Sequence, residues 1–321
     1  MVIVFRADGG TRPDIAMGHI YRSCLIADQL KNRFKIVFIS QDEEDFRPGH
    51  QEIQKRGYDL YLTQDNRVDF LLDQINPAFA VIDLYEYSKS ILKPFIFKKI
   101  PILTFDHFDE SKLLSHFPIN PVLIDGRGEY DGLNYTVIPN PLRFTKKKNV
   151  EEIFLSFGGY DYGKISKRVL QILSKVAGGF KINLVIGSSF PKEDILELIE
   201  KDFRVQLFEN PKNFNEILAK SDIAVVAGGL TFFQSLSEGI PCIVICQYNH
   251  QKETAQAIGN AETFRLLGVF DEIEDKDIQS SLEELINDSR KREQYSLAGI
   301  RLVDGLGLNR VINIIESVVN K

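Results

Sequence analysis

The first residues of this chain that could do chemistry are a glycine-bearing loop and the histidine that closes it. The loop opens with Arg6-Ala7-Asp8-Gly9-Gly10 and ends with Gly18-His19-Ile20-Tyr21-Arg22. Glycines let a phosphate or a sugar approach the backbone, and the free N–H groups at the start of a helix attract an anion. A histidine at that position can exchange protons near neutral pH. The segment therefore predicts a ligand site that contains an acid–base group.

The apolar pattern places this loop between a strand and a helix. Residues 2–5 form a β-branched run typical of a buried strand, and apolar residues recur at helical spacing over 20–30. In an open parallel sheet, ligands bind at the carboxyl ends of the strands, which is where such a loop lies. The loop has neither the G-x-G-x-x-G of a dinucleotide site nor the Gly-Lys-Ser/Thr of a Walker loop. The alternative interpretation is an ordinary turn in which His19 only caps the helix.

The second half of the chain carries further glycine pairs after predicted strands. Gly158-Gly159 follows one strand, and Gly228-Gly229 follows another and directly precedes a helix. Such a helix start is a ready site for an anion, and Thr231 could satisfy its N–H groups. Glu238 lies about two turns further along the helix at ~3.6 residues per turn, so its carboxylate could bond to both hydroxyls of a ribose. The alternative is a tight turn followed by a solvated carboxylate.

Strand-like and helix-like segments alternate along the whole chain, which predicts an α/β fold with doubly wound parallel sheets. The expected strands are 2–5, 35–40, 59–62, 79–83, 102–105, 122–124 and 135–138, then 152–157, 181–186, 205–208, 223–227 and 242–246. The expected helices are 20–30, 49–56, 67–74 and 88–98, then 165–176, 193–201, 214–220 and 231–238, others starting at 251, 277 and 289, and 308–319.

A break near the middle divides this pattern into two Rossmann-like domains. Pro139-Asn140-Pro141 interrupts the alternation, and the charged stretch 146–149 is typical of an interdomain linker. We expect an N-terminal domain over 1–145, a C-terminal domain over 150–305, and a terminal helix over 306–321 that packs back on the first domain. We also expect the two domains to face one another across a cleft, with their glycine loops lining one ligand site.

Composition narrows the class of protein. A chain of 321 residues with 44% hydrophobic residues suits two folded α/β domains. The net charge of -6 argues against a nucleic-acid partner. No apolar run approaches the ~20 residues of a membrane span, and the chain enters a strand with no signal peptide. These features predict a cytoplasmic protein without a membrane span.

The cysteines predict neither a disulfide nor a metal site. Cys242 and Cys246 share one predicted strand, where residues four apart are separated by ~13 Å. Cys24 belongs to the apolar stripe of the first helix. We therefore expect all three to be reduced core residues. No His, Cys or carboxylate cluster has metal-site spacing, so we expect no metal.

Together these motifs resemble the glycosyltransferase-B superfamily and, within it, the UDP-sugar hydrolases of pseudaminic acid biosynthesis and the related spore-coat polysaccharide proteins. Arg6-Ala7-Asp8 followed by Gly18-His19 and Arg22 is similar to their first-loop motif. The other matching segments are Asp83-Leu84-Tyr85, Ser156-Phe157-Gly158-Gly159-Tyr160-Asp161 and Ala227-Gly228-Gly229-Leu230-Thr231. They span most of the chain.

The resemblance implies hydrolysis of a UDP-activated amino or deoxy sugar at its anomeric carbon. The products would be UDP and the free sugar, with inversion and without a cofactor. Such a reaction would serve nonulosonic acid synthesis, as in flagellin glycosylation, or surface polysaccharide synthesis. Helix starts and glycine amides could stabilise the departing UDP without a metal.

The resemblance also implies a set of site residues. His19 would orient or deprotonate the attacking water, Tyr85 would hold the sugar or the water, and Asp8 would complete the catalytic group. The implied substrate-binding residues are Arg6, Gly9, Gly10, Gly18, Arg22, Asp83, His107, Gly158, Gly159, Asp161, Gly228, Gly229, Leu230, Thr231, Glu238 and Gln251.

Two alternatives share the same motifs, because a fold does not fix a function. One is a glycosyltransferase that passes the sugar of a UDP-sugar donor to an acceptor. The other is a non-catalytic sugar-nucleotide binding protein. UDP release without an acceptor, UDP release only with one, and binding without turnover would distinguish the three. The sequence predicts no oligomeric state.

Overall fold

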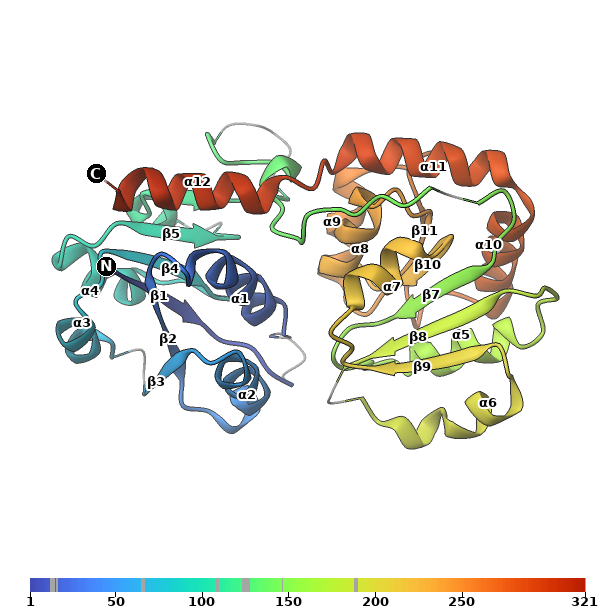
Figure 1. The fold of residues 1–321 in the computed structure, drawn as a ribbon, viewed down its shortest axis with the longest axis horizontal. Coiled ribbons are helices and arrows are strands. Elements are labelled where there is room, and N and C mark those ends of the chain that lie inside the picture. The colour runs from blue at the N-terminus through green and yellow to red at the C-terminus, as the bar shows by residue number, and fades with distance from the viewer. Residues whose placement is uncertain are drawn as a thin grey trace. The chain divides into compact units, whose positions relative to one another are not determined.

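The chain forms two compact α/β units, each built around one sheet (Figure 1). The computed structural model describes residues 1–11, 15, 17–64, 67–107, 110–122, 128–145, 147–187 and 190–320. The first unit contains Met1–Ile138 and Leu306–Lys321, and the second contains Pro139–Gly305. The chain therefore leaves the first unit once and returns to it with its last helix.

The first unit is a parallel sheet with helices on both faces. Its strands are β1 (Val2–Ala7), β2 (Lys35–Gln41), β3 (Asp59–Thr63), β4 (Phe79–Asp83), β5 (Ile102–Phe105) and β6 (Phe117–Ile119). Its helices are α1 (Gly18–Leu30), α2 (Arg47–Lys55), α3 (Asp69–Ile75), α4 (Lys89–Phe97) and α12 (Gly307–Val319), with 3-10 turns η1 (Glu44–Phe46), η2 (Glu110–Leu114) and η3 (Leu133–Tyr135). The strand order is β3-β2-β1-β4-β5-β6.

The strand order reverses between β1 and β4, which is the position where doubly wound sheets bind ligands. The register of this pair sets Ala7 beside Asp83 at the carboxyl edge of the sheet. Every residue of β4 is buried, because helices cover both faces of this central strand. Such strands are apolar along their length. The polar Asp83 at the end of this strand is therefore held at a fixed, dry position.

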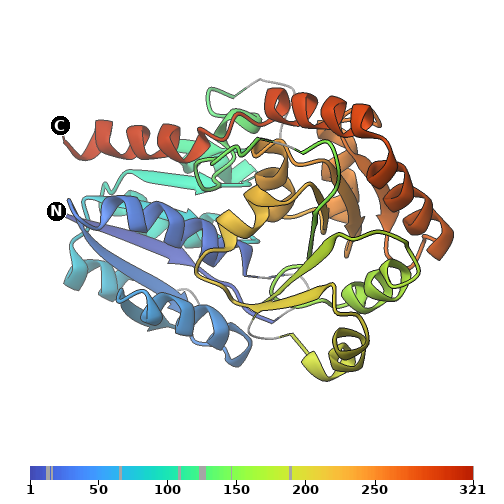
Figure 2. The ribbon, with the colours of Figure 1, turned by 45° about the vertical axis from the view of Figure 1, so that its right-hand side comes forward.

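Helix α12 completes the first unit. Val311, Ile315 and Val319 on one side of this helix are buried in the core that α1 and β1 also form. Figures 1 and 2 both show α12 lying beside α1. Arg33 near the end of α1 pairs with Glu316 of α12. The last helix thus covers apolar surface that the first 138 residues leave open.

The second unit repeats the same topology. Its strands are β7 (Glu152–Ser156), β8 (Lys181–Ile186), β9 (Val205–Glu209), β10 (Ile223–Val226), β11 (Cys242–Cys246) and β12 (Arg265–Val269), in the order β12-β11-β10-β7-β8-β9. Its helices are α5 (Ile165–Leu173), α6 (Leu196–Lys201), α7 (Phe214–Lys220), α8 (Leu230–Ser237), α9 (Asn249–Ile258), α10 (Asp275–Asn287) and α11 (Ser289–Leu302), with the turn η4 (Lys192–Asp194). Here the order reverses between β7 and β10.

Some expected strands differ from the observed ones. The strand expected at 135–138 is wrong: Tyr135 ends η3, and Val137 and Ile138 are apolar because they are buried in the core. The edge strands β6 and β12 escaped prediction because Pro118 and Gly268 argue against a strand. Of the strand expected at 122–124, residues 123 and 124 lie outside the described residues.

The expected linker at 146–149 falls inside the second unit. Residue 146 lies outside the described part of the chain, while the Arg292 guanidinium donates to the Lys148 carbonyl within that unit. Cys24, Cys242 and Cys246 are buried, which confirms their expected place in the core. Among the helices that the structure describes, none is long and apolar enough to cross a membrane.

Candidate active site

A histidine and a buried aspartate meet at the strand-order reversal of the first unit. Asp83 ends β4 and is fully buried, and His19 lies in the first turn of α1. His19 Nδ1 lies 2.7 Å from Asp83 Oδ1. The His19 side chain keeps 17% of its surface exposed, and its other ring nitrogen has no role in this pair. The two residues form a histidine–carboxylate pair with one free end.

Arg22 fixes the charge and orientation of Asp83. Its Nε and one terminal nitrogen donate to the two carboxylate oxygens at 2.7 and 2.6 Å, a bidentate arrangement. Burial alone would raise the pKa of Asp83, but Arg22 and then His19 outweigh it and lower the pKa to about 2. An ionised carboxylate only accepts hydrogen bonds, so Nδ1 of His19 carries the proton. In the neutral ring, Nε2 is therefore the acceptor.

Arg22 is itself held on two further sides. Its other terminal nitrogen pairs with Asp106 at 2.7 Å, and its guanidinium carbon lies 4.4 Å from the centre of the Phe105 ring. Asp106 follows β5 directly and adopts a positive φ of 50°. Sequence reasoning missed Asp106 and chose its neighbour His107. The available signal was an acidic residue directly after a predicted strand, at the same edge as Asp83.

Arg6 and Asp8 do not have the substrate-facing roles expected of them. Both are buried, and they pair through two hydrogen bonds of 2.6 and 2.7 Å. Asp8 also accepts from the Ser40 hydroxyl and the Gln41 N–H. Burial raises the pKa of Asp8, but these partners, Arg6 first, lower it overall. The pair joins the ends of β1 and β2, which corrects the catalytic role predicted for Asp8.

The glycines of the first loop serve packing as much as ligand access. A Cβ on Gly10 would lie 1.7 Å from the Asp45 carbonyl oxygen, and the Gly9 carbonyl lies against Gly49 of α2. Gly10 and Gly49 therefore allow η1 and α2 to approach the loop closely. Gly18 differs, because a Cβ there would meet only open space at the start of α1. Of the expected glycine contacts, Gly18 has the geometry that a ligand needs.

The other candidates of the first unit separate into one exposed and one buried residue. Tyr85 follows Asp83 by two positions and is 46% exposed. His107 is fully buried and stacks on Tyr87 at a ring-centre distance of 4.0 Å. This burial corrects the substrate contact expected of His107. Tyr87, which the sequence did not single out, donates to the carbonyls of Ile82 and Phe105 and so joins β4 to β5.

In the second unit, the backbone after β7 and β10 is open. Gly158 has a φ of 83° and Gly229 caps α8, and a Cβ on either would meet nothing within 4 Å. Helix α8 starts at Leu230 without a side-chain cap, so Thr231 does not cap it as expected. Gly228 instead permits the close approach of Gln251 at the start of α9. No side chain caps the first N–H groups of α8, so these groups could bind an anion.

Asp161 and Gln251 hold loops instead of presenting free groups. Asp161 is buried and accepts from the N–H groups of Ile165 and Ser166 at the start of α5, and burial raises its pKa. Gln251 accepts from the Gln247 N–H at 2.9 Å. Asp161 thereby fills the anion position of α5 with its own carboxylate, which corrects its expected contact with substrate. Gly159 packs against Gly187 of the next strand-end loop.

Glu238 does not present its carboxylate to a ribose. It is buried, and its oxygens accept from the N–H groups of Leu142 and Arg143 at distances of 2.8 to 3.1 Å. The Arg143 side chain in turn donates from Nε to the Ser237 carbonyl, next to Glu238. The carboxylate thus anchors the segment that enters the second unit. This corrects the ribose contact predicted for Glu238.

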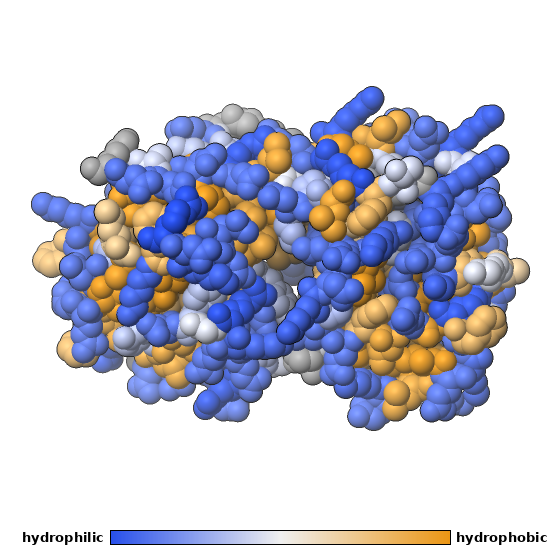
Figure 3. All heavy atoms as spheres, in the orientation of Figure 1, coloured by the Kyte–Doolittle hydropathy of each residue, from blue (hydrophilic) through white to orange (hydrophobic). Residues whose placement is uncertain are grey.

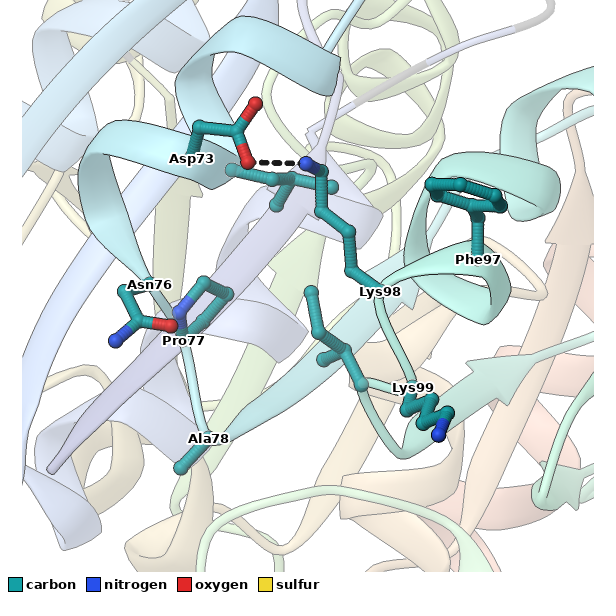
Figure 4. Close-up of a pocket in the computed structure, with 9 residues that line it drawn as sticks. Asp73, Asn76, Pro77, Ala78, Phe97, Lys98 and Lys99 are labelled. Atoms are coloured by element: carbon teal, nitrogen blue, oxygen red, sulfur yellow. Dashed lines mark hydrogen bonds and ion pairs between the residues drawn. The ribbon is translucent and has the colours of Figure 1, made fainter.

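A hollow of about 430 Å³ in the first unit lies away from His19 (Figure 4). Asn76, Pro77 and Ala78, directly before β4, line it together with the ends of α3 and α4. It therefore opens at the amino ends of the strands, opposite the edge at which parallel sheets bind ligands. Among the described residues, no group of three His, Cys, Asp or Glu could hold a metal ion.

These elements define an α/β protein with the fold of the glycosyltransferase-B structures. MurG from Acinetobacter baumannii matches with a TM-score of 0.74 at 10% identity, covering 98% of this chain and 99% of that one. The spinosyn rhamnosyltransferase SpnG, complexed with thymidine diphosphate, gives 0.66 at 12% identity, covering 98% and 99%. S. aureus MnaA, solved with UDP, gives 0.65 at 13% identity, covering 99% and 97%. The expected fold class is confirmed.

Curated relatives are more similar in sequence. The spore coat polysaccharide biosynthesis protein SpsG of Bacillus subtilis is 26% identical over 337 aligned positions, covering 97% of each chain. An uncharacterized protein of Methanocaldococcus jannaschii is 27% identical over 287 positions; the match covers 79% of this chain and only 57% of that protein. No protein-family model matches the chain. The expected similarity to the spore-coat polysaccharide proteins is thus confirmed.

The lowered pKa of Asp83 makes its contribution to stability depend on pH. A folded-state pKa near 2, against an ordinary 3.8, stabilises the fold above about pH 4 and loses that effect as pH falls toward 2. We expect Asp83→Asn to lower the free energy of unfolding at pH 7 by at least about 2 kcal/mol, with the difference from wild type shrinking below pH 4. Urea titrations followed by circular dichroism measure it. Asp73→Asn, at an exposed ion pair on α3, is the control, and a difference for Asp83→Asn that is independent of pH would contradict the assignment.

Glu238→Ala should affect stability and leave nucleotide binding intact. The change removes a buried carboxylate that accepts from two partly buried N–H groups. Hydrogen bonds to a charged group contribute about 1.5–3 kcal/mol, so we expect a loss of about 2 kcal/mol in the free energy of unfolding. The dissociation constant for UDP should stay unchanged. Denaturant titration and calorimetry measure the two quantities. Glu216→Ala, at an exposed position on α7, is the control; a folded Glu238→Ala variant with weakened UDP binding would restore the ribose role.

Proposed function

We propose that this protein hydrolyses a UDP-activated deoxy or amino sugar at its anomeric carbon. The pair of His19 and Asp83 is the observation that carries the proposal. Nε2 of His19 accepts a proton from water, the water oxygen bonds to the anomeric carbon, and the bond from that carbon to the UDP oxygen breaks. The electron pair of that bond leaves with UDP. Attack on the face opposite UDP inverts the anomeric centre.

The buried partner explains why His19 suits this step. Asp83 holds the ring in one tautomer and stabilises the positive charge that forms when Nε2 takes the proton, as in other histidine–carboxylate pairs. Arg22 holds Asp83 ionised and in place. A non-catalytic binding protein has no need of such an arrangement. The hydrolase proposal therefore stands above the binding-protein alternative.

The nucleotide is assigned to the second unit in this proposal. The uncapped start of α8 and the open backbone at Gly158 and Gly229 would receive the diphosphate through N–H groups. Solved structures of the same fold contain UDP or thymidine diphosphate, which supports a nucleotide ligand. In the same proposal the enzyme acts in the cytoplasm, without a metal, and its product enters a surface polysaccharide or a nonulosonic acid.

A glycosyltransferase is the second candidate. The same histidine could take a proton from an acceptor hydroxyl instead of from water, and a rhamnosyltransferase is among the proteins with this fold. The two functions differ in the nucleophile and therefore in their need for an acceptor. Similarity to a polysaccharide biosynthesis protein is compatible with either.

The distinguishing experiment measures UDP release from UDP-sugars in EDTA-containing buffer, with and without acceptor sugars. Stoichiometric UDP and free sugar without acceptor are the expected result, because the His19 pair needs only water. Release that occurs only with an acceptor would replace the hydrolase with a transferase. Turnover that requires added Mg²⁺ would contradict the metal-free diphosphate site.

His19→Asn should lower kcat and leave UDP affinity nearly unchanged. A positioned general base contributes about 10²–10⁴-fold to a rate, and UDP is assigned to the other unit. The measurements are kcat, the dissociation constant for UDP and the melting temperature of one preparation. Gln29→Ala, at an exposed position on the same helix, is the control. A kcat near that of wild type would remove His19 from the mechanism and leave exposed Tyr85 as the next residue to test.

A further inference from the structure

An aromatic cluster lies at the carboxyl edge of the second sheet. Tyr162, after β7, has its ring centre 6.2 Å from that of Tyr248, after β11. Tyr248 in turn stacks on His250 at 5.6 Å with an interplanar angle of 12°. Tyr162 is 55% exposed, and His250 is also exposed. Large rings left in solvent at this edge do not serve the core.

The loops that carry the aromatic cluster are fixed by buried polar contacts. The side chain of Gln247 donates to the Phe157 carbonyl at 2.8 Å and accepts from the Tyr162 N–H at 2.9 Å. Asp161, directly before Tyr162, is pinned to the start of α5. Buried Asp161 between exposed Tyr160 and Tyr162 gives the loop an anchored backbone and outward rings. Such preorganisation lowers the entropy cost of binding a ligand.

The aromatic cluster crosses the end of β10. In the sheet, β10 lies between β7 and β11, so a contact between the loops after β7 and β11 passes over the loop that starts α8. Gly163 reaches still further, to Phe270 after β12, and Gln251 abuts Gly228. The rings therefore adjoin the glycine turn to which the diphosphate is assigned.

We propose that the aromatic cluster of Tyr162, Tyr248 and His250 is the specificity surface for the sugar, and that it selects a neutral hexose with an apolar face, such as a deoxy or N-acylated sugar. This inference rests on the proposed nucleotide site. Aromatic faces pack against the C–H surfaces of such a sugar.

The geometry favours a sugar over the nucleobase. Tyr248 and His250 already stack on one another, so no flat base inserts between them. The cluster also lacks a cation for an acidic sugar. Burial lowers the pKa of His250, so its ring is uncharged at neutral pH, and Lys252 on the same helix pairs with Glu272 at 2.6 Å.

The test compares ring removal on two ligands, UDP-N-acetylglucosamine and UDP, by calorimetric titration. All proteins carry His19→Asn so that the sugar nucleotide survives the titration. Tyr162→Ala should weaken binding of UDP-N-acetylglucosamine about three- to tenfold, a typical effect for one stacking ring, and leave UDP binding unchanged. Tyr162→Phe keeps the ring and should keep both affinities.

Phe203→Ala is the matched control. Phe203 is an aromatic of the same unit, 97% exposed, just before the amino end of β9, where hydrophobic residues gather over α6 and β9 (Figure 3). Equal weakening of both ligands by Tyr162→Ala would place the ring on the nucleotide and overturn the inference, as would no weakening of either. Weaker binding of UDP-N-acetylglucosamine alone supports the inference. It does so even if the wild-type protein releases no UDP, because that result would contradict only the proposed hydrolysis.

Discussion

The ion pair between Asp83 and Arg22 is the constraint on which the geometry of the first site depends. A carboxylate buried at the end of a central strand is stable only with a cation and hydrogen bonds around it. Arg22 meets that need with two bonds to Asp83, and Asp106 in turn shares the charge of Arg22. Removing one partner of such a pair typically costs about 3–5 kcal/mol, because the other charge stays buried alone. Asp83 also bonds to His19, so the ion pair that holds Asp83 in place also fixes the orientation of the His19 ring.

The second unit uses carboxylates in another way. Asp161 and Glu238 each accept backbone N–H groups, one at the start of α5 and one from the segment at Leu142 and Arg143. Both fix chain segments and leave no oxygen pointing outward for a ligand. What the unit offers outward is backbone at Gly158 and Gly229 and a set of uncharged rings. This division suits a diphosphate attached to a neutral sugar, since an exposed carboxylate beside the phosphates would repel them.

The fold could be predicted because its central strands are apolar on both faces. Runs such as 79–83 and 242–246 have no other stable position than the centre of a helix-covered sheet. The site could be predicted only in part. His19, Arg22 and Asp83 were found from loops that follow strands, but the actual partners of Glu238 lie about a hundred positions away in sequence, and no local pattern indicates them. Asp8 and Asp161 were misassigned for the same reason: a carboxylate in a glycine-rich loop reads as a ligand group until its N–H partners are known.

The wrong predictions for charged residues have one feature in common, and this feature bears on the function. The charged residues expected to touch substrate or act on it proved to be buried and paired within the protein. They are Arg6, Asp8, Arg22, Asp83, Asp161 and Glu238. Polar groups that pair within the protein hold loops in place, and the free energy of those pairs goes into preorganisation instead of into contact with ligand. Among the residues that the structure describes, the candidates to act on a substrate include one imidazole nitrogen, the exposed Tyr85, the open glycines Gly18, Gly158 and Gly229, and the aromatic cluster. In the proposed function, such a site binds through backbone and rings and confines its acid–base chemistry to a single histidine.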